Sequence, residues 1–192
     1  MLTYPKKPKT IVGIDYSLNS PALCITNSSF EFERCSFHFL TRKKKHICNF
    51  GNNIFGYEHS EYNTPIERFS QISDWVFSII NKVSNPKVFI EGYSFGSKGQ
   101  AVFQIAENCG ILKYRLQLAE IEYDTVVPSV VKKFASSKGN ADKQLMYDSF
   151  KEHTKVDLMK KFDMEKLNNP VTDIVDSYYI AKVGYENSIN NT

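Results

Sequence analysis

Four carboxylates stand in otherwise apolar stretches of this sequence. Asp15 ends the run IVGI, Glu91 follows the run VFI, and Asp173 and Asp176 lie within the segment VTDIVD. A carboxylate in such surroundings is destabilising unless a cation shares its site. Because carboxylate oxygens are the ligands that hard divalent cations such as Mg2+ prefer, the pattern predicts a cluster that holds divalent metal ions.

The surrounding elements must bring three distant segments together. Apolar runs and alternation predict strands at 10–16, 22–26, 30–40, 87–92 and 120–127, with a slip between Phe32 and Cys35 that fits a bulge. Helical spacing predicts helices at 64–82, 100–119, 128–134, 141–152 and 170–185, the first opened by a capping box, Thr64-Pro-Ile-Glu67. This order predicts an α/β fold, with a mixed five-stranded sheet whose first three strands are antiparallel and which is flanked by helices.

This arrangement would place the four acids at one edge of the sheet. Asp15 and Glu91 stand at or near the carboxyl ends of strands, where open α/β sheets gather ligands. Asp173 and Asp176 are three apart on a helix, on the face that also carries Ile180, so they should point towards the sheet. Singly, each acid also fits a turn, a loop, a helix N-terminus or an exposed surface. Together they favour a two-metal site that would activate water against a phosphodiester.

Length and composition predict one globular domain spanning 1–192, with a basic tail (1–9), an insertion loop (41–63) and a frayed C-terminus (186–192). Hydrophobic residues make up 42% of the 192 positions and charged residues 23%. No apolar run approaches the ~20 residues of a membrane helix, and the N-terminus lacks the apolar core of a signal peptide. We therefore expect a cytoplasmic protein with no membrane partner.

Charge and cysteine usage add two expectations. The net charge is only +3, but basic residues gather at 6–9, 42–46, 132–133 and 138–143. Such patches are compatible with nucleic-acid binding, although a solvated loop is the alternative for any one of them. Cys24, Cys35, Cys48 and Cys109 have no zinc-binding spacing, which favours reduced thiols.

Six segments, taken in order, carry a family signature: IVGID ending at Asp15, FIEGYSF (89–95), AVFQIAENCG (101–110), PSVVKK (128–133), KGNADK (138–143) and DIVDSYYIA (173–181). Over nearly the whole chain they resemble the RuvC-type Holliday junction resolvases of the RNase H-like superfamily. The KGNADK segment and the final D-x-x-D pattern are the most specific parts. Two features depart from the family. Tyr16-Ser17 follows the first aspartate, where Pro-Gly or similar is usual, and the 41–63 insertion is longer than is usual. Small phage-encoded members of the family also vary in these two places.

The resemblance implies a metal-dependent, structure-selective endonuclease that cleaves four-way (Holliday) DNA junctions in recombination, repair or replication. It assigns two Mg2+ ions, or Mn2+, to the four acids: Asp15, Glu91, Asp173 and Asp176. It adds Lys138 and Lys143 as catalytic residues at the scissile or neighbouring phosphates. It also implies DNA contacts from Tyr93, Phe95, Lys98, Lys132 and Lys133, with an aromatic ring stacking on an unpaired base. The near two-fold symmetry of a junction implies a homodimer, for which 102, 105, 106, 109 and 112 offer one apolar helix face.

Three alternatives remain open at the level of sequence. A broader branched-DNA or RNA–DNA hybrid nuclease of the same superfamily would use the same acids and metals on a different substrate. A non-catalytic module that binds branched nucleic acid is a second possibility, against which the presence of all four acids argues. A sugar-kinase-like fold also opens with an apolar strand ending in aspartate, but it needs glycine-rich phosphate loops that the sequence lacks.

Overall fold

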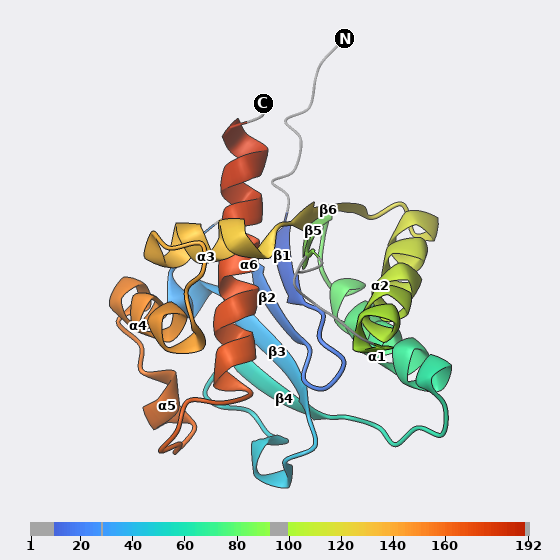
Figure 1. The fold of residues 1–192 in the computed structure, drawn as a ribbon, viewed down its shortest axis with the longest axis horizontal. Helices are drawn as coiled ribbons and strands as arrows, with labels where there is room; N and C mark the ends of the chain where they lie inside the picture. Colours follow the sequence, from blue (N-terminus) through green and yellow to red (C-terminus); the bar gives the residue numbers. More distant parts are fainter. Residues whose placement is uncertain (1–9, 28, 93–99, 191–192) are drawn as a thin grey trace.

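A six-stranded mixed sheet of order β4-β3-β2-β1-β5-β6 forms the centre of the fold (Figure 1). The structure is a computed structural model that describes residues 10–27, 29–92 and 100–190. β2 pairs antiparallel with both β1 and β3, whereas β4, β5 and β6 each pair in parallel with a neighbour. The strands are β1 (Thr10–Asp15), β2 (Ala22–Thr26), β3 (Ser36–Thr41), β4 (Ile54–Glu58), β5 (Pro86–Glu91) and β6 (Glu122–Val126).

Helices cover both faces of the sheet, which gives three layers. Successive residues of a strand point to opposite faces, and β1 accordingly sends Ile11 to one core and Val12 and Ile14 to the other. α1 and α2 pack on the second of these cores, while α3, α4 and α6 pack on the first. The helices are α1 (Pro65–Ile80), α2 (Gln100–Leu118), α3 (Pro128–Ser136), α4 (Lys143–Thr154), α5 (Leu158–Lys161) and α6 (Val171–Asn190).

Two glycines let α6 lie directly on the sheet. A Cβ on Gly13 of β1 would stand 2.3 Å from the backbone nitrogen of Ala181 and 2.4 Å from the carbonyl oxygen of Ser177. A Cβ on Gly184 of α6 would stand 2.1 Å from the ring of Phe89 on β5. Real Cβ atoms do not approach other atoms so closely, so only glycine permits this contact. The close approach fixes α6 against the strands that carry the first two acids.

The start of α1 confirms the predicted capping box. The hydroxyl of Thr64 accepts a hydrogen bond from the Glu67 N–H at 3.2 Å. The Glu67 carboxylate in turn accepts a hydrogen bond from the N–H of Asn63 at 2.7 Å, one residue before the usual partner. Pro65 occupies the first helical position, where its missing N–H is not needed.

The segment from 30 to 40 is only partly the expected strand. A short 3-10 helix, η1 (Phe32–Arg34), comes first, and β3 begins at Ser36. The aromatic spacing reflects packing, since the Phe32 ring stacks on Phe37 with centroids 5.3 Å apart. The carbonyls left outside the sheet are satisfied by Asn53, whose amide donates to Phe32 O at 2.8 Å and to Cys35 O at 3.1 Å.

The 41–63 insertion is not irregular throughout, which corrects the expected strand count from five to six. It contains a second 3-10 turn, η2 (Lys44–His46), and the edge strand β4, which pairs in parallel with β3. The signal for β4 is weak because the strand is short and has Gly56 at its centre. A Cβ there would stand 1.9 Å from His46 O, so the glycine serves the contact between β4 and η2.

Smaller differences complete the comparison with expectation. α6 continues past Tyr185 to Asn190, so most of the segment expected to fray is helical. α5 was not predicted. The basic tail 1–9 lies outside the described residues. Cys24, Cys35 and Cys109 are buried free thiols and Cys48 is an exposed one. Among the described helices, none combines the length and apolar character needed to traverse a lipid bilayer.

Candidate active site

The four acids meet at one edge of the sheet, as predicted. Asp15 is the last residue of β1 and Glu91 the last of the neighbouring parallel strand β5, paired through Ile14 and Ile90. Asp173 and Asp176 lie in the first turns of α6, which packs across β1. Asp15 is 9% exposed and Asp173 only 3%, so both carboxylates have been withdrawn from water.

These acids line a cleft of about 790 Å3. One wall is the turn that follows β1, from Tyr16 to Ser20, and another is apolar, formed by Val102, Ile105 and Cys109 of α2. Lys132 of α3 and Lys143 of α4 contribute positive charge to the same cleft. The cleft therefore joins an anionic floor, a cationic side and an apolar side.

Burial and mutual repulsion make Asp15, Glu91 and Asp173 hold protons more strongly than usual. Burial raises the pKa of Asp15 well above its ordinary value, and the carboxylates of Asp173, Asp176 and Glu91 add to this. Burial, together with Asp176, raises the pKa of Glu91 to about 7. Burial also raises the pKa of Asp173 to about 7, although Ser20 and Lys143 oppose that change. A cluster with these properties favours any partner that brings compensating positive charge.

Lys143 contacts this cluster directly. Its Nζ donates to Asp176 Oδ2 at 2.9 Å. Burial works to lower the pKa of Lys143, but Asp176, Asp15 and Asp173 outweigh it, and the pKa is raised. Asp142 fixes the start of α4 by accepting from the Leu145 N–H at 2.8 Å, which places Lys143 at the first helical position. The lysine singled out by the family resemblance therefore lies beside one of the four acids.

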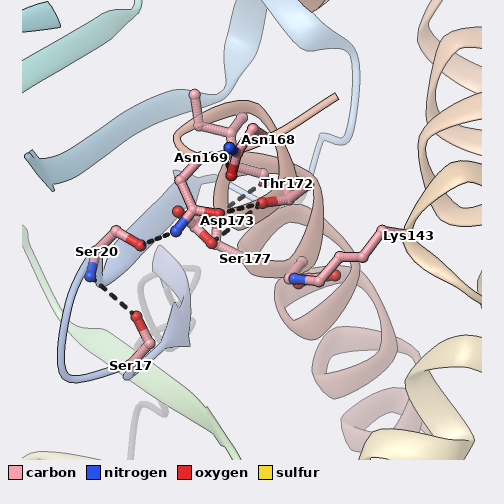
Figure 2. A network of polar contacts seen from close by, with 10 residues as sticks. Ser17, Ser20, Lys143, Asn168, Asn169, Thr172, Asp173 and Ser177 are labelled. Atoms are coloured by element: carbon pink, nitrogen blue, oxygen red, sulfur yellow. Dashed lines mark hydrogen bonds and ion pairs between the residues drawn. The ribbon is translucent and has the colours of Figure 1, made fainter. Parts of the chain in front are cut away.

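A polar network holds Asp173 against the turn after β1 (Figure 2). The Asn169 side chain donates to the Ser20 hydroxyl, and the Ser20 N–H donates to Ser17 Oγ at 3.2 Å. Thr172 Oγ1 lies 2.8 Å from Asn169 Oδ1 and 3.3 Å from Asp173 Oδ1. The network couples the first turn of α6 to the wall of the cleft. Sequence reasoning missed its members, whose only signal was that polar residues flank Asp15 and Asp173.

The donor set fits hard divalent cations. Asp173 Oδ2 is buried and has no hydrogen-bond partner in the structure, which is costly for a carboxylate oxygen unless a cation binds it. In the described ranges, no group of three or more acidic, histidine or cysteine side chains is gathered closely enough to form a complete metal site. Repulsion between the carboxylates opposes tighter clustering, and a divalent cation would reverse that force. The oxygen donors of this cluster therefore suit a hard divalent cation.

The other residues singled out from the sequence fall into two groups. Lys132 is half-buried and lines the cleft. Lys133 and Lys138 are exposed and do not line it, so the structure does not place Lys138 beside the carboxylates as Lys143 is placed. Tyr93, Phe95 and Lys98 lie outside the described residues.

Comparison with known proteins identifies the fold. No protein-family profile matches the chain. It is 27% identical over 116 residues to the crossover junction endodeoxyribonuclease RuvC of Brachyspira hyodysenteriae, an alignment that covers 60% of this chain and 71% of that protein. Among solved structures it is similar to Thermus thermophilus RuvC, with a TM-score of 0.60, 15% identity and coverage of 96% of this chain and 98% of that one. The fold is that of RuvC.

Two further structures agree with the RuvC fold. Thermus thermophilus RuvC in complex with a Holliday junction substrate gives a TM-score of 0.64 at 13% identity, over 96% of this chain and 97% of that one. The yeast mitochondrial Holliday junction resolvase Ydc2 gives 0.53 at 15% identity, over 99% and 85%. The likeness of fold extends over nearly the whole chain.

The raised pKa values predict a pH-dependent response to metal. Glu91 and Asp173 have ordinary pKa values of 4.5 and 3.8 and folded values of about 7. At pH values between the ordinary and the folded pKa values, the folded chain thus binds more protons than the unfolded one. The free energy of unfolding in EDTA should therefore fall as the pH rises through this range. Because Mg2+ competes with these protons, it should raise the midpoint of thermal unfolding more at about pH 8 than at about pH 5. Equal metal-induced shifts in thermal scans at both pH values would contradict this.

Proposed function

We propose that this protein is a metal-dependent endonuclease that cleaves four-way DNA junctions. The observation that carries the proposal is the meeting of Asp15, Glu91, Asp173 and Asp176 in one cleft, with an oxygen of Asp173 buried and unpartnered. The RuvC fold and the sequence similarity to a crossover junction endodeoxyribonuclease support it. A cleft with cationic residues beside the acids suits a polyanionic substrate.

The four carboxylates would hold two Mg2+ or Mn2+ ions. When bound, such ions lower the pKa of water and stabilise charge that develops on a phosphodiester in hydrolysis. The remaining work falls to residues of the chain. Asn169 and Ser20 keep Asp173 against the cleft wall. Lys143, which now pairs with Asp176, would bind a phosphate oxygen, and Lys132 would neutralise a neighbouring phosphate.

Positions of other DNA contacts follow from the same proposal. Exposed Lys138 lies in the connection between α3 and α4 and would contact phosphate outside the cleft. Exposed Lys133 of α3 would do the same. Tyr93, Phe95 and Lys98 directly follow Glu91 in the sequence, and we assign them the contact with unpaired bases and backbone at the branch point. As a nuclease of cellular or phage DNA, the protein would act in the cytoplasm.

A homodimer would supply two such sites to the two strands that a junction resolvase cuts. The face of α2 suggested by the sequence is not available for a dimer contact, since Cys109 and Leu112 are buried in the core. The opposite side of α2 is free, with Phe103, Tyr114 and Leu118 between 64% and 71% exposed. Their spacing places them on one face of the helix, which is an apolar patch suited to a second copy of this chain.

This dimer has a direct test in sedimentation. We expect the wild type to sediment as a dimer and the double variant Tyr114→Glu/Leu118→Lys as a monomer, because charges would enter the apolar contact. Ile66→Glu is the matched control, since Ile66 is also an exposed apolar residue, 60% exposed, but lies on α1. An unchanged mass for the double variant would show that α2 does not form the interface.

Cleavage of a substrate panel tests the proposed activity. Labelled four-way junction, flap, linear duplex and RNA–DNA hybrid would each be incubated with the protein in Mg2+ and in EDTA. We expect paired nicks in the junction, in Mg2+ only. Cutting of flaps and junctions alike would retain the metal site but broaden the substrate to branched DNA in general. Tight junction binding without cutting in Mg2+ or Mn2+ would leave only a binding module.

A further inference from the structure

A run of four basic residues follows β3 at the same sheet edge as the acids. β3 is parallel to β1, since each pairs antiparallel with β2 between them. The carboxyl ends of both strands therefore face the same way, and Arg42, Lys43, Lys44 and Lys45 come directly after Thr41. The cleft uses none of these residues. We refer to residues 42–45 as the basic rim.

The basic rim is joined to the cleft by hydrogen bonding. Lys43 Nζ donates to the carbonyl oxygen of Asn169 at 3.0 Å, and Asn169 both lines the cleft and bonds Ser20. The connection between β3 and β4 consequently lies beside the start of α6, as its cyan trace shows (Figure 1). A phosphate backbone that leaves the cleft past Asn169 would meet the basic rim next.

The rim is a fixed part of the surface. At its far end His46 is 1% exposed, and its ring packs edge-on against Phe50 at 6.0 Å and Phe162 at 5.6 Å. At its near end the Arg42 guanidinium lies 5.2 Å from the centre of the Tyr62 ring. Lys44 and Lys45 belong to a short helical turn, η2, and Lys43 directly precedes it, so the backbone that carries these lysines has a defined conformation.

The charge of the rim is not neutralised locally. All four residues are exposed, and in the described parts of the chain none of them forms an ion pair. The guanidinium of Arg68 also lies over the Tyr62 ring, 5.0 Å from the centre of the ring. Arg68 donates a hydrogen bond to the carbonyl oxygen of Leu18, in the cleft wall, at 2.8 Å. Positive charge thus continues from the wall of the cleft to the rim.

We propose that the basic rim binds the phosphate backbone of the DNA arm that leaves the active-site cleft. The cleft would then lie between two cationic groups, Lys132 and Lys143 on the side of α3 and α4, and the rim on the side of β3 and β4. The insertion that carries the rim gives this chain a DNA contact of its own beside the shared catalytic fold. The inference rests on the proposed function for the identity of the nucleic acid, but not on cleavage.

The salt dependence of DNA binding tests the rim. Fluorescence anisotropy in EDTA would follow binding of a long-armed junction by the wild type and by Lys44→Gln/Lys45→Gln, over a series of salt concentrations. Each lost phosphate contact lowers the slope of log affinity against log salt by about 0.9, so the double variant should lose roughly 2 and bind about ten-fold or more weakly at ~0.1 M salt. Both side chains are exposed, so the fold should tolerate the change.

Controls separate this inference from the proposed function. Lys82→Gln removes an exposed lysine beyond the C-terminal end of α1, near the opposite edge of the sheet where β5 begins, and should leave affinity and slope unchanged. Lys82→Gln should also cleave the junction at the wild-type rate in Mg2+. Wild-type affinity and salt slope in the double variant would overturn the inference while leaving a cleaving enzyme intact. If the wild-type protein did not cleave the junction in Mg2+, the proposed function would be refuted instead.

Discussion

Asp15→Asn is expected to abolish DNA cleavage and, in EDTA, to make the folded protein more stable. The negative charges of the other three acids all act on Asp15. Replacing its carboxylate by the amide of asparagine would therefore remove a metal ligand from the centre of the cluster. The loss should be on the order of 10^3-fold or more in cleavage rate, equivalent to about 4 kcal/mol of barrier. The gain in stability follows from the same geometry, because a neutral amide replaces a buried charge that is repelled by Asp173, Asp176 and Glu91.

Single-turnover cleavage and thermal unfolding measure the two effects. At about pH 8 in EDTA we expect the midpoint of unfolding to rise by about 3 °C, which is roughly 1 kcal/mol for a chain of this size. Asp148→Asn is the matched control, since Asp148 is an exposed acid of α4 that bonds Gln144 and lies outside the cleft. Cleavage by Asp15→Asn at the wild-type rate would show that the carboxylate cluster takes no part in the reaction.

Gly13→Ala is expected to destabilise the fold strongly through the addition of a single methyl group. The added Cβ would meet backbone atoms of α6 at 2.3 and 2.4 Å, and backbone cannot rotate away as a flexible side chain would. Either β1 or α6 must shift, at a cost of about 3 kcal/mol or more. Since Asp15 is on β1 and Asp173 and Asp176 are on α6, the same shift would separate the acids and reduce cleavage.

Denaturant unfolding and cleavage of the same preparation would test this. Gly139→Ala provides the comparison, because a Cβ there finds its nearest neighbour, Ser129 O, at 3.4 Å, an ordinary contact. We expect Gly139→Ala to change the free energy of unfolding by less than about 0.5 kcal/mol. If Gly13→Ala unfolded at the wild-type denaturant concentration, α6 would not pack on β1 as described.

The four acids of the cleft could be singled out because their signal is local. An acid that terminates an apolar strand, or that stands on the apolar face of a helix, is visible in a few consecutive residues. Lys143, which follows Asp142 at the start of α4, was instead singled out by the family resemblance of the KGNADK segment. Their meeting at one edge then follows from the topology of a sheet whose parallel strands end together.

The supporting residues could not be predicted, since their contacts join distant parts of the chain. Asn169 and Ser20 are 149 residues apart, and Lys43 and Asn169 are 126 apart. No local pattern marks such pairs. β4 was missed for a related reason, because a five-residue edge strand with a central glycine gains its stability from β3 and η2 and not from its own sequence.

The most direct test of the central claim compares cleavage of one labelled four-way junction by the wild type, Asp15→Asn and Asp148→Asn over a Mg2+ titration. We predict paired nicks that depend on Mg2+ for the wild type and Asp148→Asn, and none for Asp15→Asn at any Mg2+ concentration. Junction cleavage that persists in EDTA, or that Asp15→Asn performs as well as Asp148→Asn, would contradict the assignment of the carboxylate cluster as a metal-dependent nuclease site.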